Sequence, residues 1–128
     1  MELTAGLSAQ VELVVGDADT AQNLGSGDVP VLATPRVIAL CEAASVAATA
    51  GKLAPDTSTV GSQVELTHRA PTPVGGVVVA RATLAKVDGH RLGFEVVVSQ
   101  NGQVVAEGRL ERVVVDRHDF LRRATEQL

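Results

Sequence analysis

The chain has 128 residues and a formal net charge of −4, and 45% of its residues are hydrophobic while only 2% are aromatic. This length favours one domain over residues 1–128, with a core built mainly from alanine, valine and leucine. Because the chain is acidic and has no basic run interleaved with aromatic residues, we expect no nucleic-acid partner. It also lacks a signal-peptide pattern and any apolar stretch near the roughly 18 residues that cross a bilayer, so we expect a cytoplasmic protein without a membrane partner.

The first predicted strand covers residues 11–15, where apolar side chains recur on one face. Gly16 is expected to end it. Residues 16–33 are rich in aspartate, asparagine, glycine and serine and show little periodicity, which predicts a long loop. Long loops in compact domains often act as lids, so this segment is a candidate cover for a site.

A long helix is predicted from Thr34 to about residue 50. The threonine can cap the free amide donors of the first turn, and Pro35 has no amide donor to leave unsatisfied. Gly51 suits the left-handed conformation that often ends a helix. Between these ends the side chains leave almost no polar face, so we expect the helix to be buried nearly all round.

The remaining chain changes to the alternating pattern of strands. Val64, Leu66 and His68 share one face, which should turn toward the helix. Further strands are predicted over about 77–87, 91–99 and 104–115, and the dipeptides Asp88-Gly89 and Asn101-Gly102 between them favour tight hairpins.

A short terminal helix is predicted after the last strand. Asp116 is a suitable N-cap, and Phe120, Leu121 and Ala124 lie on one side of the helix that follows. We expect this apolar side to pack against the rest of the protein.

One long apolar helix followed by an antiparallel meander predicts an α+β fold, namely a single hotdog domain whose sheet curls around the helix. A ferredoxin-like domain is the main alternative. That fold normally shows a second long amphipathic helix between strands, and the sequence does not contain one.

Glu42 is the first candidate functional residue, because a carboxylate inside a nearly all-apolar helix loses hydration unless a partner compensates. Burial would raise its pKa and a neighbouring imidazolium would lower it, and either perturbation is common at functional sites. A solvated helix edge or a buried hydrogen-bond anchor is the alternative interpretation.

His68 is the second candidate, because strand alternation turns it inward. A lone inward histidine is more often a core residue than a catalyst, but a helix carboxylate converging on a strand imidazole could form the acid/base pair of acyl transfer. Thr34 is either the helix cap alone or part of the same groove. It precedes Glu42 by two turns, about 12 Å of helical rise, so substrate rather than direct contact would join the two.

Arg112 shares an inward strand face with Leu110 and Val114, so it needs an anion: Glu42, a substrate phosphate or another carboxylate. Cys41 is expected to be a buried structural thiol among apolar neighbours. No spacing of cysteine, histidine and aspartate resembles a metal site, so no metal is predicted.

At this point the chain resembles the fluoroacetyl-CoA thioesterase family of hotdog proteins over roughly residues 8–125. Thr34 and Glu42 in TPRVIALCE resemble the helix motif of the family. Gly61 and His68 in GSQVELTHRAPTPVG resemble its glycine-to-histidine segment, and Arg112 in GRLERVVV resembles the arginine of a later motif.

The resemblance implies hydrolysis of a small acyl-CoA thioester by a homodimer, with Thr34, Glu42 and His68 as the catalytic set at a subunit interface. Gly61 would line the acyl pocket, and Arg112 would orient the active-site groups or bind substrate. No separate cofactor is implied, since coenzyme A is part of the substrate. A thin core, which gains from an extra buried interface, also favours a homodimer.

The segment GDADTAQNLGSGDVPVLA departs from the fluoroacetyl-specific pattern, because it contains none of the aromatic residues that form a hydrophobic lid in that enzyme. We therefore expect a general acyl-CoA specificity. A non-catalytic hotdog module that binds an acyl-CoA or an acyl carrier is the alternative function. Hotdog hydratases or dehydratases form a third class, which the helix spacing fits less well.

Overall fold

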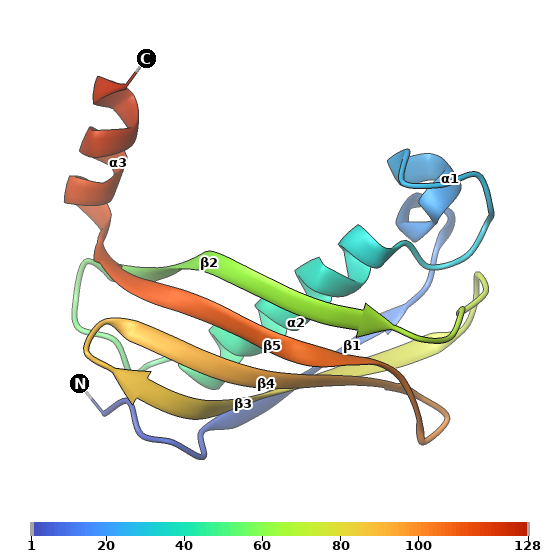
Figure 1. The fold of residues 1–128 in the computed structure, drawn as a ribbon, viewed down its shortest axis with the longest axis horizontal. Coiled ribbons are helices and arrows are strands. Elements are labelled where there is room, and N and C mark those ends of the chain that lie inside the picture. Colours follow the sequence, from blue (N-terminus) through green and yellow to red (C-terminus); the bar gives the residue numbers. More distant parts are fainter. Residues whose placement is uncertain (1, 128) are drawn as a thin grey trace.

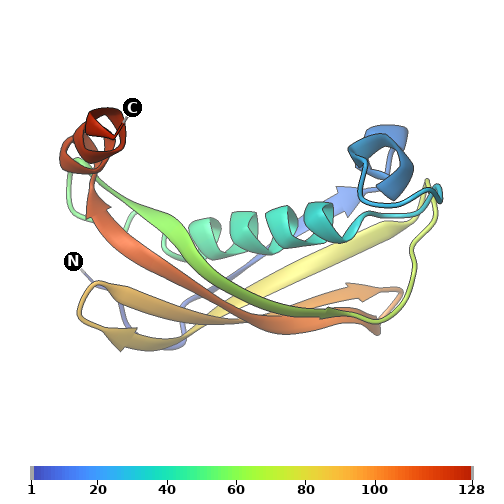
Figure 2. The same ribbon diagram turned by 45° about the horizontal axis from the view of Figure 1, so that its top comes forward.

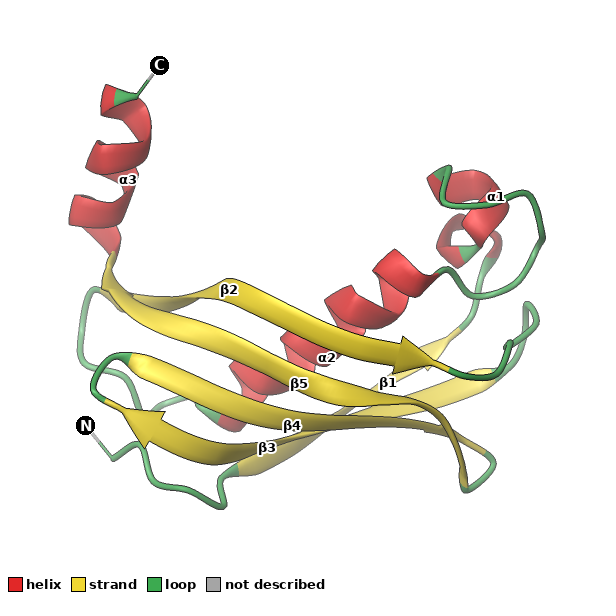
Figure 3. Cartoon of the chain, viewed as in Figure 1, coloured by secondary structure: helices red, strands yellow, loops and turns green. Residues whose placement is uncertain are grey.

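The protein, described here by a computed structural model over residues 2–127, folds as one antiparallel sheet curled around a long helix (Figure 1, Figure 2). The elements are β1 (Ser8–Val14), η1 (Asp17–Asp19), α1 (Ala21–Leu24), α2 (Thr34–Ala48), β2 (Thr57–His68), β3 (Val77–Asp88), β4 (Arg91–Gln100), β5 (Gln103–Asp116) and α3 (Arg117–Glu126). Their order in the sheet is β1-β3-β4-β5-β2. Figure 3 shows that α2 is the only long helix placed against the sheet in the described part of the chain, so the predicted α+β arrangement is confirmed.

Helix α2 buries one face against the sheet and leaves the other open. Its buried residues are Val37, Leu40, Cys41, Ala44, Ser45 and Ala48. Val46 on the opposite side is 49% exposed. The expectation of burial nearly all round is therefore wrong for this chain by itself, because the sheet covers only one side of the helix.

The two predicted hairpin turns are confirmed between β3 and β4 and between β4 and β5. Asn101 and Gly102 both have positive φ angles, 52° and 78°, and Gly89 has a φ of 61°. Tight hairpin turns require such angles, which glycine and asparagine adopt at little cost.

Strand β2 is one edge of the sheet and pairs only with β5 among the described strands. Its register shifts at a bulge between Gly61 and Gln63, and residues 61–65 are exposed. Val64 pairs with the buried Leu110, so it lies on the predicted inner face of the sheet, but at this open edge it is 41% exposed. Leu66 and His68, nearer the strand end, are half-buried.

The segment 16–33 contains two short helical turns, η1 and α1, which the loop prediction missed. Asp19 accepts a hydrogen bond from the amide of Gly16, and the Thr20 hydroxyl accepts one from the amide of Asn23. Thr20 also bridges to Leu32 as an isolated β-pair. These local caps fold the segment back over the N-terminal end of α2 (Figure 1).

Helix α3 starts where predicted, because the Asp116 carboxylate accepts a hydrogen bond from the amide of Asp119 at 2.8 Å. It has no buried residue, and Leu121 is 58% exposed. The predicted packing of its apolar side is wrong within this chain, since β5 runs directly into α3 and carries it away from the sheet (Figure 1). No helix among residues 2–127 is long and apolar enough to cross a membrane.

Candidate active site

Thr34 and His68 meet at the N-terminal end of α2. The Thr34 hydroxyl lies 2.8 Å from Nδ1 of His68, the last residue of β2. Ala33 is the N-cap residue, and no side chain caps the helix. The prediction that Thr34 caps the helix is therefore wrong, and its hydroxyl is instead directed to the imidazole.

The environment of His68 favours a neutral ring. Burial lowers the pKa of His68 from its ordinary value of 6.5, and the backbone of Ala70 opposes this effect only in part. The Nε2 atom is buried and has no hydrogen-bond partner among the described residues. A neutral imidazole with a free nitrogen can take or give a proton.

A pocket of about 360 Å³ opens beside the Thr34–His68 pair. The segment between α1 and α2 forms one wall, including Ser26, Asp28 and Val29, and residues 69–71 form another. No aromatic side chain lines it within the described chain.

Glu42 pairs with Arg112 rather than with His68. Oε2 of Glu42 lies 3.2 Å from Nη1 of Arg112, and the side chain of Arg112 is only 9% exposed. Burial lowers the pKa of the Arg112 guanidinium, and the Glu42 carboxylate acts in the opposite direction. The predicted inward Arg112 is confirmed, and its anion is Glu42.

Thr59 completes the contacts of Arg112 and was not identified from the sequence. Its hydroxyl accepts from Nε of Arg112 at 2.9 Å, and its carbonyl accepts from Nη2 at 2.9 Å. Its position two residues before Gly61, on the same strand face, was the signal that could have found it.

Gly61 lies against Glu42. A Cβ atom at Gly61 would stand 2.5 Å from Oε2 of Glu42 and 3.6 Å from Nη1 of Arg112. Gly61 does not line the pocket beside Thr34 and His68. Its role within the chain is to leave space for the carboxylate.

The candidate residues thus form two separate pairs. No hydrogen bond joins Glu42 to Thr34 or His68 within residues 2–127. The convergence of Glu42 on His68 that strand direction suggested does not occur inside one chain. Thr34 and Glu42 remain about 12 Å apart along the helix, as their spacing requires.

Other chemistry-bearing groups lie apart from these pairs. Cys41 is buried, and burial is the main cause that raises the pKa of its thiol to about 11, which disfavours a thiolate. Within residues 2–127, no three histidine, cysteine, aspartate or glutamate residues are grouped to hold a metal.

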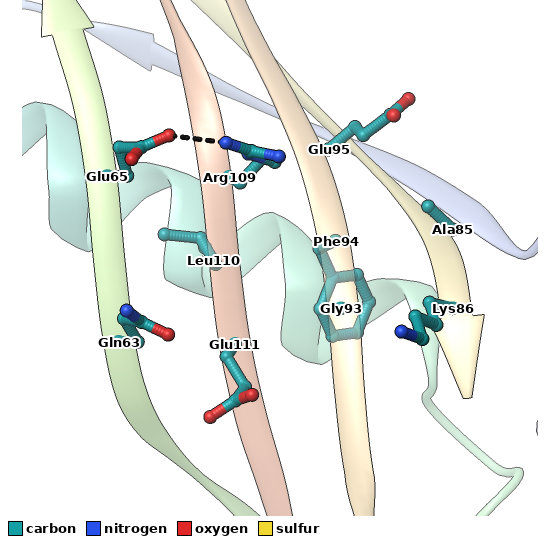
Figure 4. A pocket seen from close by; sticks show the side chains of 10 residues that line it. All are labelled: Gln63, Glu65, Ala85, Lys86, Gly93, Phe94, Glu95, Arg109, Leu110 and Glu111. Carbon is teal, nitrogen blue, oxygen red and sulfur yellow. Dashed lines mark hydrogen bonds and ion pairs between the residues drawn. The ribbon is translucent and has the colours of Figure 1, made fainter. Parts of the chain in front are cut away.

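A second pocket, of about 370 Å³, lies on the outer face of the sheet (Figure 4). Glu65 and Arg109 form an ion pair at 2.8 Å across it. Because Glu65 already neutralises this arginine, and the pair is exposed, the surface has the character of solvated sheet rather than of an anion site.

The curled sheet, its single long helix and the threonine–histidine pair define a hotdog-fold protein of the thioesterase type. The family model described as fluoroacetyl-CoA-specific thioesterase matches residues 15–118. The chain belongs to this family, which confirms the resemblance seen in the sequence.

Individual relatives agree with this assignment. The fluoroacetyl-CoA thioesterase of Streptantibioticus cattleyicolor is 34% identical over 90 residues, which cover 70% of this chain and 65% of that protein, slightly less than two thirds of its length. A solved structure of the fluoroacetyl-CoA thioesterase FlK superposes with a TM-score of 0.93 at 28% identity, over 100% of this chain and 99% of that chain. A thioesterase superfamily member from Thermus thermophilus gives a TM-score of 0.89 at 27% identity, over 98% and 96% of the two chains.

Proposed function

We propose that this protein is an acyl-CoA thioesterase that hydrolyses a small acyl-CoA thioester to a free acid and coenzyme A. The observation that carries the proposal is the 2.8 Å contact between the Thr34 hydroxyl and His68 beside an open pocket. Membership of a family described as thioesterases supports the same reaction. No cofactor is needed, since coenzyme A is part of the substrate, and the proposed location is the cytoplasm.

His68 is assigned the proton transfers. Because burial keeps the imidazole neutral, it can accept a proton as water attacks the thioester carbon, directly or after attack by Thr34 or Glu42. The same proton can then go to the leaving thiolate of coenzyme A. The reaction adds one water and releases an acid and a thiol.

Helix α2 contributes its dipole to the site. Pro35 has no N–H, and the amides of Arg36 and Val37 both donate to the carbonyl of Ala33. These two amides are therefore already engaged, and the partial positive charge of the helix end is what favours a polarised thioester oxygen.

The proposal includes a homodimer in which Glu42 acts on the site of the other subunit. Within one chain Glu42 lies against Gly61, while His68 is six paired positions further along β2, since one residue forms the bulge, or about 20 Å at the rise of a strand. Counted in pairs with β5, the midpoint between Gly61 and His68 is Glu65, because Glu65 pairs with Arg109, midway between Arg112 and Ala106. Antiparallel pairing of two β2 edges about that midpoint would set Gly61 and its Glu42 beside His68 of the partner subunit.

The exposure of β2 supports this pairing. Residues 61–65 are exposed, and β2 uses only one of its two edges, toward β5. An unpaired strand edge is a ready template for a second copy. Light scattering at micromolar concentration should report twice the chain mass, and a stable monomer would contradict the proposed interface.

A panel of short acyl-CoA thioesters, with fluoroacetyl-CoA as one member, tests the reaction by release of free thiol. Fluoroacetyl-CoA is included in the panel because the chain is similar to a fluoroacetyl-CoA thioesterase. A lid segment without aromatic residues favours release from several acyl groups. Binding of acyl-CoA without thiol release from any of them would favour the non-catalytic binding module.

Two tagged heterodimers test whether Glu42 acts across the interface. In the first, one chain carries His68→Ala and the other Glu42→Gln. Action across subunits leaves one intact site and about half of the activity, whereas action within a chain leaves none.

The second heterodimer, wild type with a chain carrying both substitutions, reverses the expectation. Action across subunits then leaves no intact site, and action within a chain leaves one. Opposite results from the two samples exclude an effect of folding or of tag.

A further inference from the structure

The Arg112 guanidinium has contacts on three of its N–H directions, and two of them go to one residue. Nε and Nη2 donate to the hydroxyl and the carbonyl of Thr59, and Nη1 faces Glu42. A guanidinium is a rigid planar fork, so fixing two of its donors also fixes the direction of the third.

The register of the sheet explains why Thr59 is in reach. Gly61 is directly across from Arg112 on β5. Thr59 is across from Val114, which is the next inward-facing residue of β5 after Arg112. The Arg112 side chain leans along the strand over that distance. Both residues are buried, with Thr59 at 9% and Arg112 at 8% exposure, so water cannot replace the contact easily.

We propose that Thr59 is a positioning residue for the thioesterase reaction, holding Arg112 so that its third donor fixes the carboxylate of Glu42. This inference rests on the proposed function, since it assigns Glu42 a part in the chemistry. It adds a residue that neither the helix motif nor the histidine segment contains.

The dependence of Glu42 on this arrangement follows from its own surroundings. Its side chain is 36% exposed, and Arg112 is the only side chain that holds its carboxylate within residues 2–127. Gly61 gives the carboxylate space without giving it a hydrogen-bonding side chain. If the guanidinium turns, nothing else on β2 or β5 restores the orientation of Glu42.

The test compares Thr59→Val, which keeps the shape and removes the hydroxyl acceptor, with Thr59→Ser, which keeps the acceptor. Thr59→Val should lower kcat by about 10-fold with KM within a factor of two, because it misaligns a reacting group without touching the pocket. Thr59→Ser should restore most of kcat. Thr83→Val, the same change on the outer face of β3, is the control and should leave both constants unchanged.

A second measurement separates positioning from general structural damage. In a Glu42→Gln background, Thr59→Val should have little further effect on the residual rate, since residues that act through one another are not additive. If Thr59→Val does not fold, Thr59→Ala removes the same acceptor and takes its place.

The outcomes are distinct. Full kcat in Thr59→Val, an effect on KM alone, or an equal loss with and without Glu42 would each overturn the inference while the thioesterase function stands. A wild-type protein that releases no thiol from any acyl-CoA would overturn both.

Discussion

The Thr34 hydroxyl and Nδ1 of His68 lie 2.8 Å apart although 34 residues separate them in the chain. The first belongs to the start of α2 and the second to the end of β2, so the fold brings a helix end and a strand end to one point. This contact is tested by removing the hydroxyl alone. Thr34→Val should lower kcat by about 100-fold, whereas Thr34→Ser should stay within a few-fold of wild type.

Circular dichroism of both variants should match wild type, because the Thr34 hydroxyl does not cap the helix. Thioester hydrolysis at saturating substrate gives kcat. Equal activity of the valine and serine variants would remove Thr34 from the catalytic set and leave His68 to act with water alone.

The second prediction concerns pH. Burial lowers the pKa of His68 below 6.5, so the unfolded chain binds this proton at a higher pH than the folded chain does. Above pH 6.5 both states are neutral and His68 adds no pH dependence to stability. As the pH falls below 6.5, the unfolded state gains protons first, so the folded state loses stability until the folded pKa is passed.

The pH dependence of activity should also reflect the protonation of His68. With the neutral imidazole as the proposed base, kcat/KM should be flat near pH 7 and decline only below pH 6.5. His68→Gln should remove both the acid limb of the rate profile and this part of the pH dependence of melting, with a loss of turnover of about 100-fold. An unchanged acid limb in a folded His68→Gln protein would assign that limb to another group.

The third prediction concerns Glu42→Gln. Arg112 keeps both contacts with Thr59 and can still meet the amide oxygen of glutamine, and Glu42 is partly exposed, so unfolding free energy should fall by roughly 1 kcal/mol. Activity should fall by about 100-fold, because the amide cannot accept a proton or attack. A loss near 3 kcal/mol with activity retained would make Glu42 a structural anchor.

Thermal unfolding and thioester hydrolysis should be measured on the same sample of Glu42→Gln. Glu126→Gln is the matched control, since it removes an exposed ion pair with Arg122 on α3. It should change neither the melting temperature nor the rate.

The fourth prediction concerns Gly61→Ala. The added Cβ would stand 2.5 Å from Oε2 of Glu42, at the far end of a flexible side chain, so the carboxylate should move and the backbone should not. Melting should therefore change little while kcat falls by about 10-fold or more. Gly93→Ala, whose Cβ would have ordinary contact at 3.6 Å with Lys86, is the control. Full activity of Gly61→Ala would show that Glu42 tolerates displacement.

Most of the sheet could be predicted from the sequence because its determinants are local. Alternation marks each strand, and Asp88-Gly89 and Asn101-Gly102 set the turns through their own backbone preferences. The turns within residues 16–33 depend on side-chain caps from Asp19 and Thr20, which composition alone does not distinguish from loop chemistry. The apolar side of α3 stays unpacked because of where β5 ends relative to the sheet, and no local sequence pattern encodes that position.

The site was predictable in its members but not in its pairing. Strand alternation gives the direction of His68 and Arg112, but it gives no position along the strand relative to the helix. The register places Arg112 across from Gly61, and this brings Arg112 rather than His68 to Glu42. His68 on β2 and Arg112 on β5 both face inward, as expected, but they lie far apart along these two paired strands.

The segment over the pocket has a practical consequence for spectroscopy. The chain contains no tryptophan and no tyrosine, so it has almost no intrinsic fluorescence at the usual excitation wavelengths. Leu24, on α1, is 47% exposed and does not line the pocket. A tryptophan introduced by Leu24→Trp would be the sole emitter at those wavelengths, and a change in its spectrum on adding acyl-CoA would report a change in the surroundings of this segment without any background to subtract.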